Sequence, residues 1–292
     1  MAQLASRVVQ QWHPQKYLAF ERYRLRPALE LLANVTSLPS SQSDDVAILD
    51  LGAGSGNMAP AFVKRWPKAH VTFLDSSASM LEHGKAQHAA NPELDASRFE
   101  YVQATFESFE PSRPLDLVFS NAAIQWVDSD AHKVLIPRLF SFLKPGGVLA
   151  IQIPDVSLQP SHQLLEETTR QLGLERDLGK LHRFTPESKP EFYYPIFQGL
   201  LSPEDITLHL NMWSTIYAQI VEGENPVADF TWSTSLGPYL EALGGREAPR
   251  AKQFEDKYRE LIAQAYPKQQ DGRTIFNYKR FFMVATKPST TA

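Results

Sequence analysis

The chain has 292 residues, of which 43% are hydrophobic and 21% charged, with a formal net charge of −4 and no cysteine. This balance is typical of a globular protein of one large domain or two, and it argues against a general nucleic-acid binder, which usually carries a basic face. The lack of cysteine excludes disulfides, thiolate nucleophiles and cysteine-ligated zinc. No apolar run approaches the ~20 residues that span a bilayer, and the first residues lack the apolar core of a signal peptide, so we expect a cytoplasmic location.

The first part of the chain predicts an arm followed by alternating strands and helices. The first 36 residues are rich in aromatic and basic side chains, and Pro27 predicts the start of a helix over 28–34. We then expect strands at 46–51, 71–74, 99–103, 115–120 and 148–153, with helices at 58–66, 79–90 and 131–142. Pro137 is expected to break the last helix, and residues 144–147 to form a turn. Such alternation is typical of an α/β fold with a doubly wound, mostly parallel sheet.

Beyond residue 154 the regular alternation ends. We expect a helix over 163–172, a strand over 206–212 where apolar and polar residues alternate, two helices within 226–266 and a closing strand over 275–285. The expected organisation is an aromatic and basic arm with a helix over 1–36, an α/β core over 37–154, and a helical cap over 155–292 that also supplies the closing strands of the sheet.

Residues 48–57 read Ile-Leu-Asp-Leu-Gly-Ala-Gly-Ser-Gly-Asn, which places three glycines between a buried strand and a helix. Glycine permits positive φ and close approach of a ligand to the main chain. The N–H groups at the start of the following helix attract polar or anionic groups. Asp75 ends the next strand, roughly the ~20 residues further on where an acid that binds ribose is found. The turn and Asp75 together predict a site for a nucleoside-containing ligand.

Dinucleotide-dependent oxidoreductases and methyltransferases both use such a turn. The spacing here is Gly-x-Gly-x-Gly rather than the Gly-x-Gly-x-x-Gly of the dinucleotide fingerprint. Residues 116–123, Asp-Leu-Val-Phe-Ser-Asn-Ala-Ala, and 143–147, Leu-Lys-Pro-Gly-Gly, resemble the fourth-strand and fifth-strand signatures of class I S-adenosylmethionine-dependent methyltransferases. The resemblance implies S-adenosylmethionine (S-adenosyl-L-methionine) as the cofactor, S-adenosylhomocysteine as its product, and no metal.

The same resemblance implies a set of cofactor-binding residues at the ends of the first four strands and in the N-terminal arm. They are Trp12, Tyr17, Asp50, Gly52, Ala53, Gly54, Gly56, Asp75, Ser76, Met80, Ala104, Thr105 and Asn121. The family usually has an acid at the position of Thr105, where it accepts from the adenine amino group. Adenine recognition is therefore expected to rely more on main-chain groups in this chain.

Segments along nearly the whole chain resemble trans-aconitate 2-methyltransferases. They are residues 12–20, 26–32, 121–126, 152–155, 160–162, 213–217 and 280–285. That family methylates one carboxylate of a small tricarboxylic acid, so the resemblance implies trans-aconitate, or another small di- or tricarboxylic acid, as the methyl acceptor and a monomethyl ester as the product. A carboxylate is already a nucleophile at neutral pH, and we therefore expect no catalytic side chain, only alignment of the reactants.

An acid with several carboxylates favours binding by arginine, which contacts carboxylates bidentately. The candidate acceptor-binding residues combine two arginines with aromatic and histidine side chains. They are Arg26, Trp126, His162, Tyr194, Trp213, Tyr217 and Arg280. Surface ion pairs explain the arginines as well, and core packing explains the aromatic residues. Gly237 stands where relatives carry an arginine, so the identity of the acid is less well defined than the chemistry.

Other hypotheses remain open beside the carboxyl methyltransferase. They are a methyltransferase that acts on a different acid, a carrier-linked acyl group or a specialised metabolite, a dinucleotide-dependent oxidoreductase, and a protein that binds S-adenosylmethionine without turnover. The segments at 116–123 and 143–147 count against the oxidoreductase. His83 and His88 are five residues apart and do not form the i, i+4 pair of a helical metal site. We expect neither a nucleic-acid nor a membrane partner.

Overall fold

The computed structural model describes residues 21–42, 45–156, 158–178, 181, 188–232 and 234–289. The chain divides into two compact units. The core unit comprises the described residues within 22–154, 188–215 and 280–289. The helical unit comprises residue 21 and the described residues within 155–181 and 216–279.

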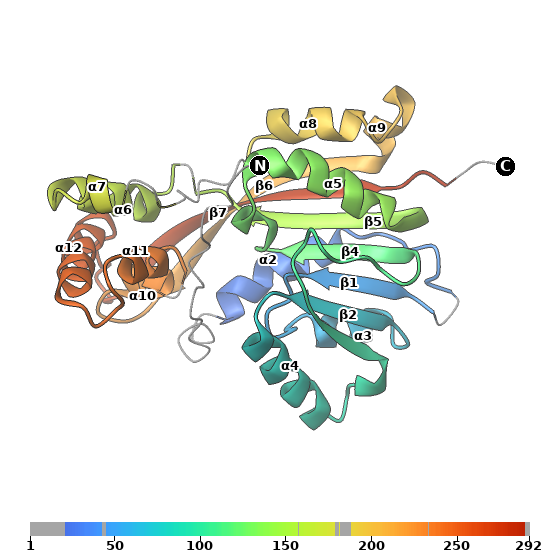
Figure 1. Ribbon diagram of the computed structural model, residues 1–292, viewed down its shortest axis with the longest axis horizontal. Coiled ribbons are helices and arrows are strands. Elements are labelled where there is room, and N and C mark those ends of the chain that lie inside the picture. Colours follow the sequence, from blue (N-terminus) through green and yellow to red (C-terminus); the bar gives the residue numbers. More distant parts are fainter. Residues whose placement is uncertain are drawn as a thin grey trace. The chain divides into compact units, whose positions relative to one another are not determined.

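A seven-stranded sheet has the strand order β3-β2-β1-β4-β5-β7-β6 (Figure 1). Its strands are β1 (Ala47–Leu51), β2 (His70–Asp75), β3 (Phe99–Gln103), β4 (Leu115–Asn121), β5 (Leu143–Pro154), β6 (Leu210–Val221) and β7 (Thr274–Thr286). Strands β1 to β5 pair in parallel, and β7 pairs antiparallel with β5, which confirms the predicted fold class. Because the carboxyl ends of parallel strands meet at one edge, Asp75 and Asn121 lie at the same edge as the glycine turn.

Helices connect the strands and make up most of the helical unit. They are α2 (Glu21–Ala33), α3 (Ala59–Arg65), α4 (Ala78–Ala90), α5 (His132–Ser141), α6 (Pro160–Gln171), α7 (Glu175–Leu178), α8 (Pro190–Gln198), α9 (Pro203–His209), α10 (Pro226–Trp232), α11 (Gly237–Ala242) and α12 (Pro249–Ala265), with 3-10 turns η1 (Ala96–Arg98), η2 (Ile124–Trp126) and η3 (Ser129–Ala131). Within the described residues, no helix combines the length and the apolar character needed to cross a membrane.

The two faces of the sheet bury different side chains. Ile151 and Phe281 belong to a large apolar cluster, in which the ring of Tyr193 from α8 stacks on Phe281 at 5.6 Å. Successive side chains of a strand alternate between faces. Gln152 and Phe282, which pair across β5 and β7, therefore lie on the opposite face. We call this opposite face the α2 face, because α2 contacts it through a side chain described below.

Some local predictions were wrong. The strand expected over 206–212 begins only at Leu210, because α9 occupies the first residues of that range. Ser202 caps this helix by accepting a hydrogen bond from Asp205 N (3.1 Å), and Pro203 takes its first position. Local capping therefore overrides the alternating pattern at 206–209.

The proline and glycine predictions also need correction. Helix α2 begins at Glu21 and contains Pro27, and α5 continues through Pro137 instead of breaking there. Residues 144–147 form an irregular start of β5 rather than a separate turn: Gly146 has φ +80°, and its N–H donates to Lys287 O at 2.8 Å. Residues 226–266 hold three helices rather than two.

Candidate active site

The glycine turn after β1 wraps around the end of β2. Gly52 N–H donates to Leu74 O, and Gly54 N–H donates to Asp75 Oδ2, both at 2.8 Å. The φ angles of Gly52, Gly54 and Gly56 are +73°, +57° and +67°. All three residues are therefore in the left-handed region that favours glycine, as the sequence pattern predicts.

The three glycines have different surroundings. A Cβ at Gly52 would lie 2.2 Å from the Cβ of Ala123, and one at Gly56 would lie 2.6 Å from a ring carbon of His88. At Gly54, the described residues place only the end of the Met80 side chain, at 3.3 Å, within 4 Å of such a Cβ. Gly52 and Gly56 are therefore required for packing inside the protein, whereas the main chain at Gly54 is open to a ligand.

Two carboxyl groups lie beside the turn. The oxygens of Asp75 accept from Gly54 N and from Ser77 N (2.9 Å). Burial raises the pKa of Asp75, although these main-chain bonds oppose the rise. Asp50 is buried, and burial together with the nearby charge of Asp75 raises its pKa to about 8. Asp50 is thus mostly protonated at neutral pH, while Asp75 keeps lone pairs that can accept from ligand hydroxyls.

His88 supports the glycine turn from α4. Its Nε2–H donates to Gly56 O at 3.0 Å, and its Nδ1 accepts from the hydroxyl of Tyr101 at 2.7 Å. Burial lowers the pKa of His88, which favours the neutral ring that these two bonds require. The sequence offered no signal for this role, because the contact depends on how α4 packs over β2 and β3.

The ends of β4 and β5 combine an unusual backbone angle with buried polar atoms that find no partner among the described residues. Ala122 has φ +52°, which is rare for a residue other than glycine and is often found at functional sites. Asn121 pairs with Gln152 in the sheet register. Asn121 Oδ1 and both amide atoms of Gln152 are buried, and none of them has a hydrogen-bond partner among the described residues. Gln152 is the single polar residue of the apolar run 148–153, a signal that the sequence analysis did not use.

A buried arginine and a tryptophan lie further along the α2 face. Arg280 is 5% exposed and pairs with Pro154, so it is two residues from Phe282 on the same face. The Trp213 ring stacks on Phe282 with centroids 4.7 Å apart and planes 5° apart. Trp213 Nε1–H donates to Glu30 Oε1 of α2 at 3.0 Å. The structure therefore brings two predicted acceptor residues, Arg280 and Trp213, to one face.

The other predicted acceptor residues of the core unit are more scattered. Arg26 is exposed on α2, one turn before Glu30, and Trp126 is half-buried in η2. Tyr194 is 41% exposed on α8, which packs through Tyr193 on the face opposite the α2 face. The structure does not bring Tyr194 together with Trp213 and Arg280.

The predicted adenine region lies after β3. Ala104 N–H donates to Asp75 O at 3.2 Å, and the Thr105 hydroxyl donates to Ser108 Oγ at 3.1 Å. Ser108 Oγ also accepts from Thr105 N–H at 3.2 Å. Ser76 is exposed beside Asp75. The Thr105 side chain is thus part of a local turn with Ser108, and its role toward adenine stays a prediction.

The remaining predicted residues belong to the helical unit or lie outside the description. In the helical unit, His162 is half-buried on α6, with its ring 6.5 Å from that of Tyr278, and Tyr217 is buried in β6. Trp12 and Tyr17 lie outside the described residues. In the described part of the chain, no three histidine, aspartate or glutamate side chains are grouped so that they could hold a metal ion.

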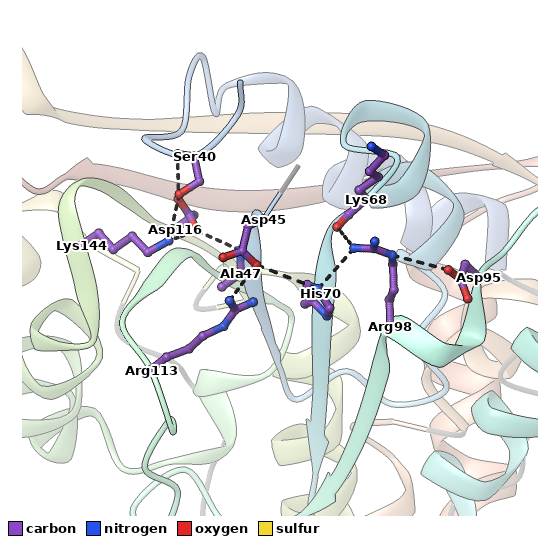
Figure 2. A network of polar contacts seen from close by, with 10 residues as sticks. All are labelled: Ser40, Asp45, Ala47, Lys68, His70, Asp95, Arg98, Arg113, Asp116 and Lys144. Carbon is purple, nitrogen blue, oxygen red and sulfur yellow. Dashed lines mark hydrogen bonds and ion pairs between the residues drawn. The ribbon is translucent and has the colours of Figure 1, made fainter. Parts of the chain in front are cut away.

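A second polar cluster lies at the opposite, amino-terminal edge of the sheet (Figure 2). The buried carboxylate of Asp116 accepts from Ser40 N (2.9 Å), Ala47 N (2.8 Å) and Lys144 Nζ (2.7 Å). These bonds fix the starts of β1, β4 and β5 against each other. Asp116, which begins one of the recognised sequence segments, therefore has a structural role in this edge of the sheet.

Comparisons with known proteins agree with this geometry. Residues 48–147 match a family described as a methyltransferase domain. The chain is 37% identical over 276 residues to the trans-aconitate 2-methyltransferase of Azoarcus sp. (strain BH72), covering 94% of this chain and 99% of that protein. It is 35% identical over 284 residues to the enzyme of the same name from Streptomyces coelicolor, covering 95% and 87%.

Solved structures share the fold at low sequence identity. An N-methyltransferase from Haemonchus contortus, in complex with phosphomonomethylethanolamine and S-adenosylhomocysteine, matches with a TM-score of 0.53 and 18% identity, and the match covers 90% of this chain and 53% of that one. A cyclopropane synthase from Mycobacterium tuberculosis matches with a TM-score of 0.51 and 15% identity, over 91% and 85%. At these identities the likeness shows the fold alone.

Proposed function

Because this chain belongs to the trans-aconitate 2-methyltransferase family, we propose that it transfers the methyl group of S-adenosylmethionine to one carboxylate of trans-aconitate or a closely related small acid. The products are the monomethyl ester and S-adenosylhomocysteine. The observation that best supports this acceptor is the buried Arg280, which lies on the same sheet face as Asn121 at the edge that carries the glycine turn. A buried guanidinium suits an anionic acceptor.

The residues around the glycine turn fit a nucleoside that carries a methionine group. Gly54 has room for close approach, and Asp75 can accept from ribose hydroxyls. The buried Oδ1 of Asn121, for which the described residues supply no donor, suits an ammonium group. When bound, S-adenosylmethionine supplies a methyl group that the sulfonium charge has already activated.

The chemistry places few demands on the side chains. A carboxylic acid has an ordinary pKa of about 4, so its oxygen carries a free lone pair at neutral pH and no proton needs to be removed. Methyl transfer forms one oxygen–carbon bond and breaks one sulfur–carbon bond. The residues of the chain have to align the reacting atoms and exclude water, and alignment of this kind contributes up to ~7–11 kcal/mol. Arg280 would hold the acid by its charge.

Mass spectrometry tests the proposal directly. The protein is incubated with S-adenosylmethionine and one acceptor at a time. The acceptors are trans-aconitate, other di- and tricarboxylic acids, and an acyl thioester. We expect a mass increase of one methyl group on trans-aconitate or a close analogue, and equal amounts of S-adenosylhomocysteine. Methylation of the acyl thioester alone would overturn the proposed acceptor, and no product from any acid would overturn the proposed reaction.

A further inference from the structure

Gln152 of β5 is a buried polar residue that finds no hydrogen-bond partner among the described residues. Its side chain is fully buried, and neither Oε1 nor Nε2 has a hydrogen-bond partner in the described part of the chain. Buried amides are nearly always paired, so an exception needs an explanation. One explanation is that the partner arrives with a ligand.

The sheet register places Gln152 among the residues already assigned to the site. It pairs with Asn121 of β4 on one side and with Phe282 of β7 on the other. Arg280 pairs with Pro154 and is therefore the diagonal neighbour of Gln152 on the same face. Diagonal neighbours in a sheet are roughly 7–8 Å apart, within reach of long side chains. Gln152 and Arg280 therefore occupy diagonal positions on one face of the sheet, and both side chains are buried.

We propose that Gln152 is a specificity-determining residue, whose Nε2–H donates to a carboxylate of the acceptor that is not methylated. The inference rests on the proposed function. A carboxylate that accepts from the Gln152 amide beside the positive charge of Arg280 would give the buried amide a partner. A hydrogen bond to a charged acceptor is about twice as strong as a neutral one. Because the amide is neutral and fixed in the strand, it favours acids that place a carboxylate at this position over acids that only carry the same charge.

Gln219 provides a matched control. It lies in the helical unit, is also buried, and both of its amide atoms also lack a partner among the described residues. Gln152→Met and Gln219→Met each replace a glutamine with an apolar side chain of similar volume. Neither substitution breaks a hydrogen bond that the described residues contain. Both variants should therefore fold, with melting temperatures equal to or above that of the wild type.

Steady-state kinetics with trans-aconitate, together with calorimetry of S-adenosylhomocysteine binding, tests the inference. For Gln152→Met we expect the KM for the acid to rise about 10-fold to 100-fold, the range expected for losing a hydrogen bond to a charged group, with cofactor affinity changed less than about twofold. Gln219→Met should leave both quantities unchanged. An unchanged KM for the acid in Gln152→Met would overturn the inference.

Analogues that each lack one carboxylate make the test more specific. If Gln152 binds a particular carboxylate, the penalty of Gln152→Met disappears for the analogue that lacks this group and persists for the others. An equal penalty for every acid would instead indicate a general distortion and would overturn the inference. If the wild type esterifies no acid, the proposed function fails and takes the inference with it. If the wild type esterifies the acid and Gln152→Met does so equally well, the inference alone fails.

Discussion

Gly54 N–H donates a 2.8 Å hydrogen bond to Asp75 Oδ2, so the middle glycine of the turn and the acid at the end of β2 form one structural unit. The second oxygen of Asp75 accepts from Ser77 N at the start of α4. Asp75 therefore holds the turn in shape before any ligand arrives. Its expected contact with ribose comes in addition to this role.

Asp75→Asn should weaken both stability and cofactor binding. An asparagine keeps one acceptor oxygen and replaces the other with an NH₂ group, so either Gly54 or Ser77 loses its acceptor. We expect the free energy of unfolding to fall by about 1–3 kcal/mol and the Kd of S-adenosylhomocysteine to rise at least about 10-fold. Urea unfolding and calorimetry measure these two quantities.

Asp95→Asn is the control for this substitution. Asp95 also accepts from a nearby main-chain N–H, that of Ser97, but it is exposed at the start of η1. Its replacement should leave cofactor affinity unchanged. Unaltered affinity in Asp75→Asn would remove Asp75 from the cofactor site.

Gly52→Ala should prevent the glycine turn from forming correctly. The new Cβ would lie 2.2 Å from the Cβ of Ala123, which is buried in the segment after β4. Gly173→Ala is a matched control, because Gly173 has a similar φ of +64° and no described residue comes within 4 Å of a Cβ built there. In both variants the alanine has to adopt a left-handed backbone conformation, which costs about 1–2 kcal/mol. Only Gly52→Ala also produces a steric clash.

We therefore expect a clearly larger fall in melting temperature for Gly52→Ala than for Gly173→Ala, together with loss of S-adenosylhomocysteine binding. Gly173→Ala should bind normally. Equal stability of the two variants would show that the segment at Ala123 moves away easily and that packing does not fix the turn.

The protonation of Asp50 predicts a pH dependence of stability. Burial and the charge of Asp75 raise the pKa of Asp50 from its ordinary value of 3.8 to about 8 in the folded protein. Below pH 3.8 both folded and unfolded states hold the proton, and between 3.8 and about 8 the folded state alone holds it. The contribution of Asp50 to stability therefore falls as pH rises through this range and is constant above it.

Asp50→Asn, which cannot ionise, should gain stability relative to the wild type as pH rises from 5 to 8. Urea unfolding at a series of pH values measures the difference. Asp45→Asn is the control: the hydrogen bond from Arg113 lowers the pKa of Asp45, so its contribution is constant over the same range. A difference between Asp50→Asn and the wild type that does not change with pH would contradict the raised pKa.

The sequence predicted the parallel sheet and the conformation of the glycine turn because these depend on local patterns. A continuous apolar run marks β1, and the spacing of glycines sets the turn at Gly54. Packing that joins distant segments was not predictable in this way. The side of the sheet on which Tyr194 lies depends on how α8 packs, and the role of His88 depends on the packing of α4. Gln152 was recognised as part of a family-like segment, but a polar residue in a buried strand does not by itself reveal whether it has a partner.

Asp116→Asn should reduce stability without changing the chemistry. Asp116 accepts three hydrogen bonds, including those from Ala47 N and Lys144 Nζ, at the edge of the sheet opposite the glycine turn (Figure 2). Removing the charge weakens the bond from Lys144, whose side chain is 26% exposed, and the loss of a hydrogen bond to a charged group costs about 1.5–3 kcal/mol. We expect a lower melting temperature with kcat and KM unchanged at a temperature where the variant is folded. A changed KM for the acid would show that this edge of the sheet influences the site.

Arg280 is expected to determine acceptor affinity through both its charge and its planar shape. It is buried on the α2 face near Gln152, whereas Arg26 is exposed on α2. An exposed charge interacts weakly across water, and a buried one interacts more strongly. Arg280→Ala should therefore raise the KM for the acid much more than Arg26→Ala does, by at least about 10-fold against a few-fold, with the affinity for S-adenosylhomocysteine nearly unchanged.

Arg280→Lys distinguishes a specific contact from general loss of folding. Lysine keeps the positive charge but cannot contact a carboxylate bidentately, so we expect an intermediate KM between those of the wild type and Arg280→Ala. Arg273, an exposed arginine in ion pairs with Glu222 and Asp271, serves as the control, and Arg273→Ala should leave the KM unchanged. If Arg280→Ala folds, binds S-adenosylhomocysteine and shows the wild-type KM, then Arg280 does not contact the acid, and the positive charge that binds the acceptor has to come from another residue.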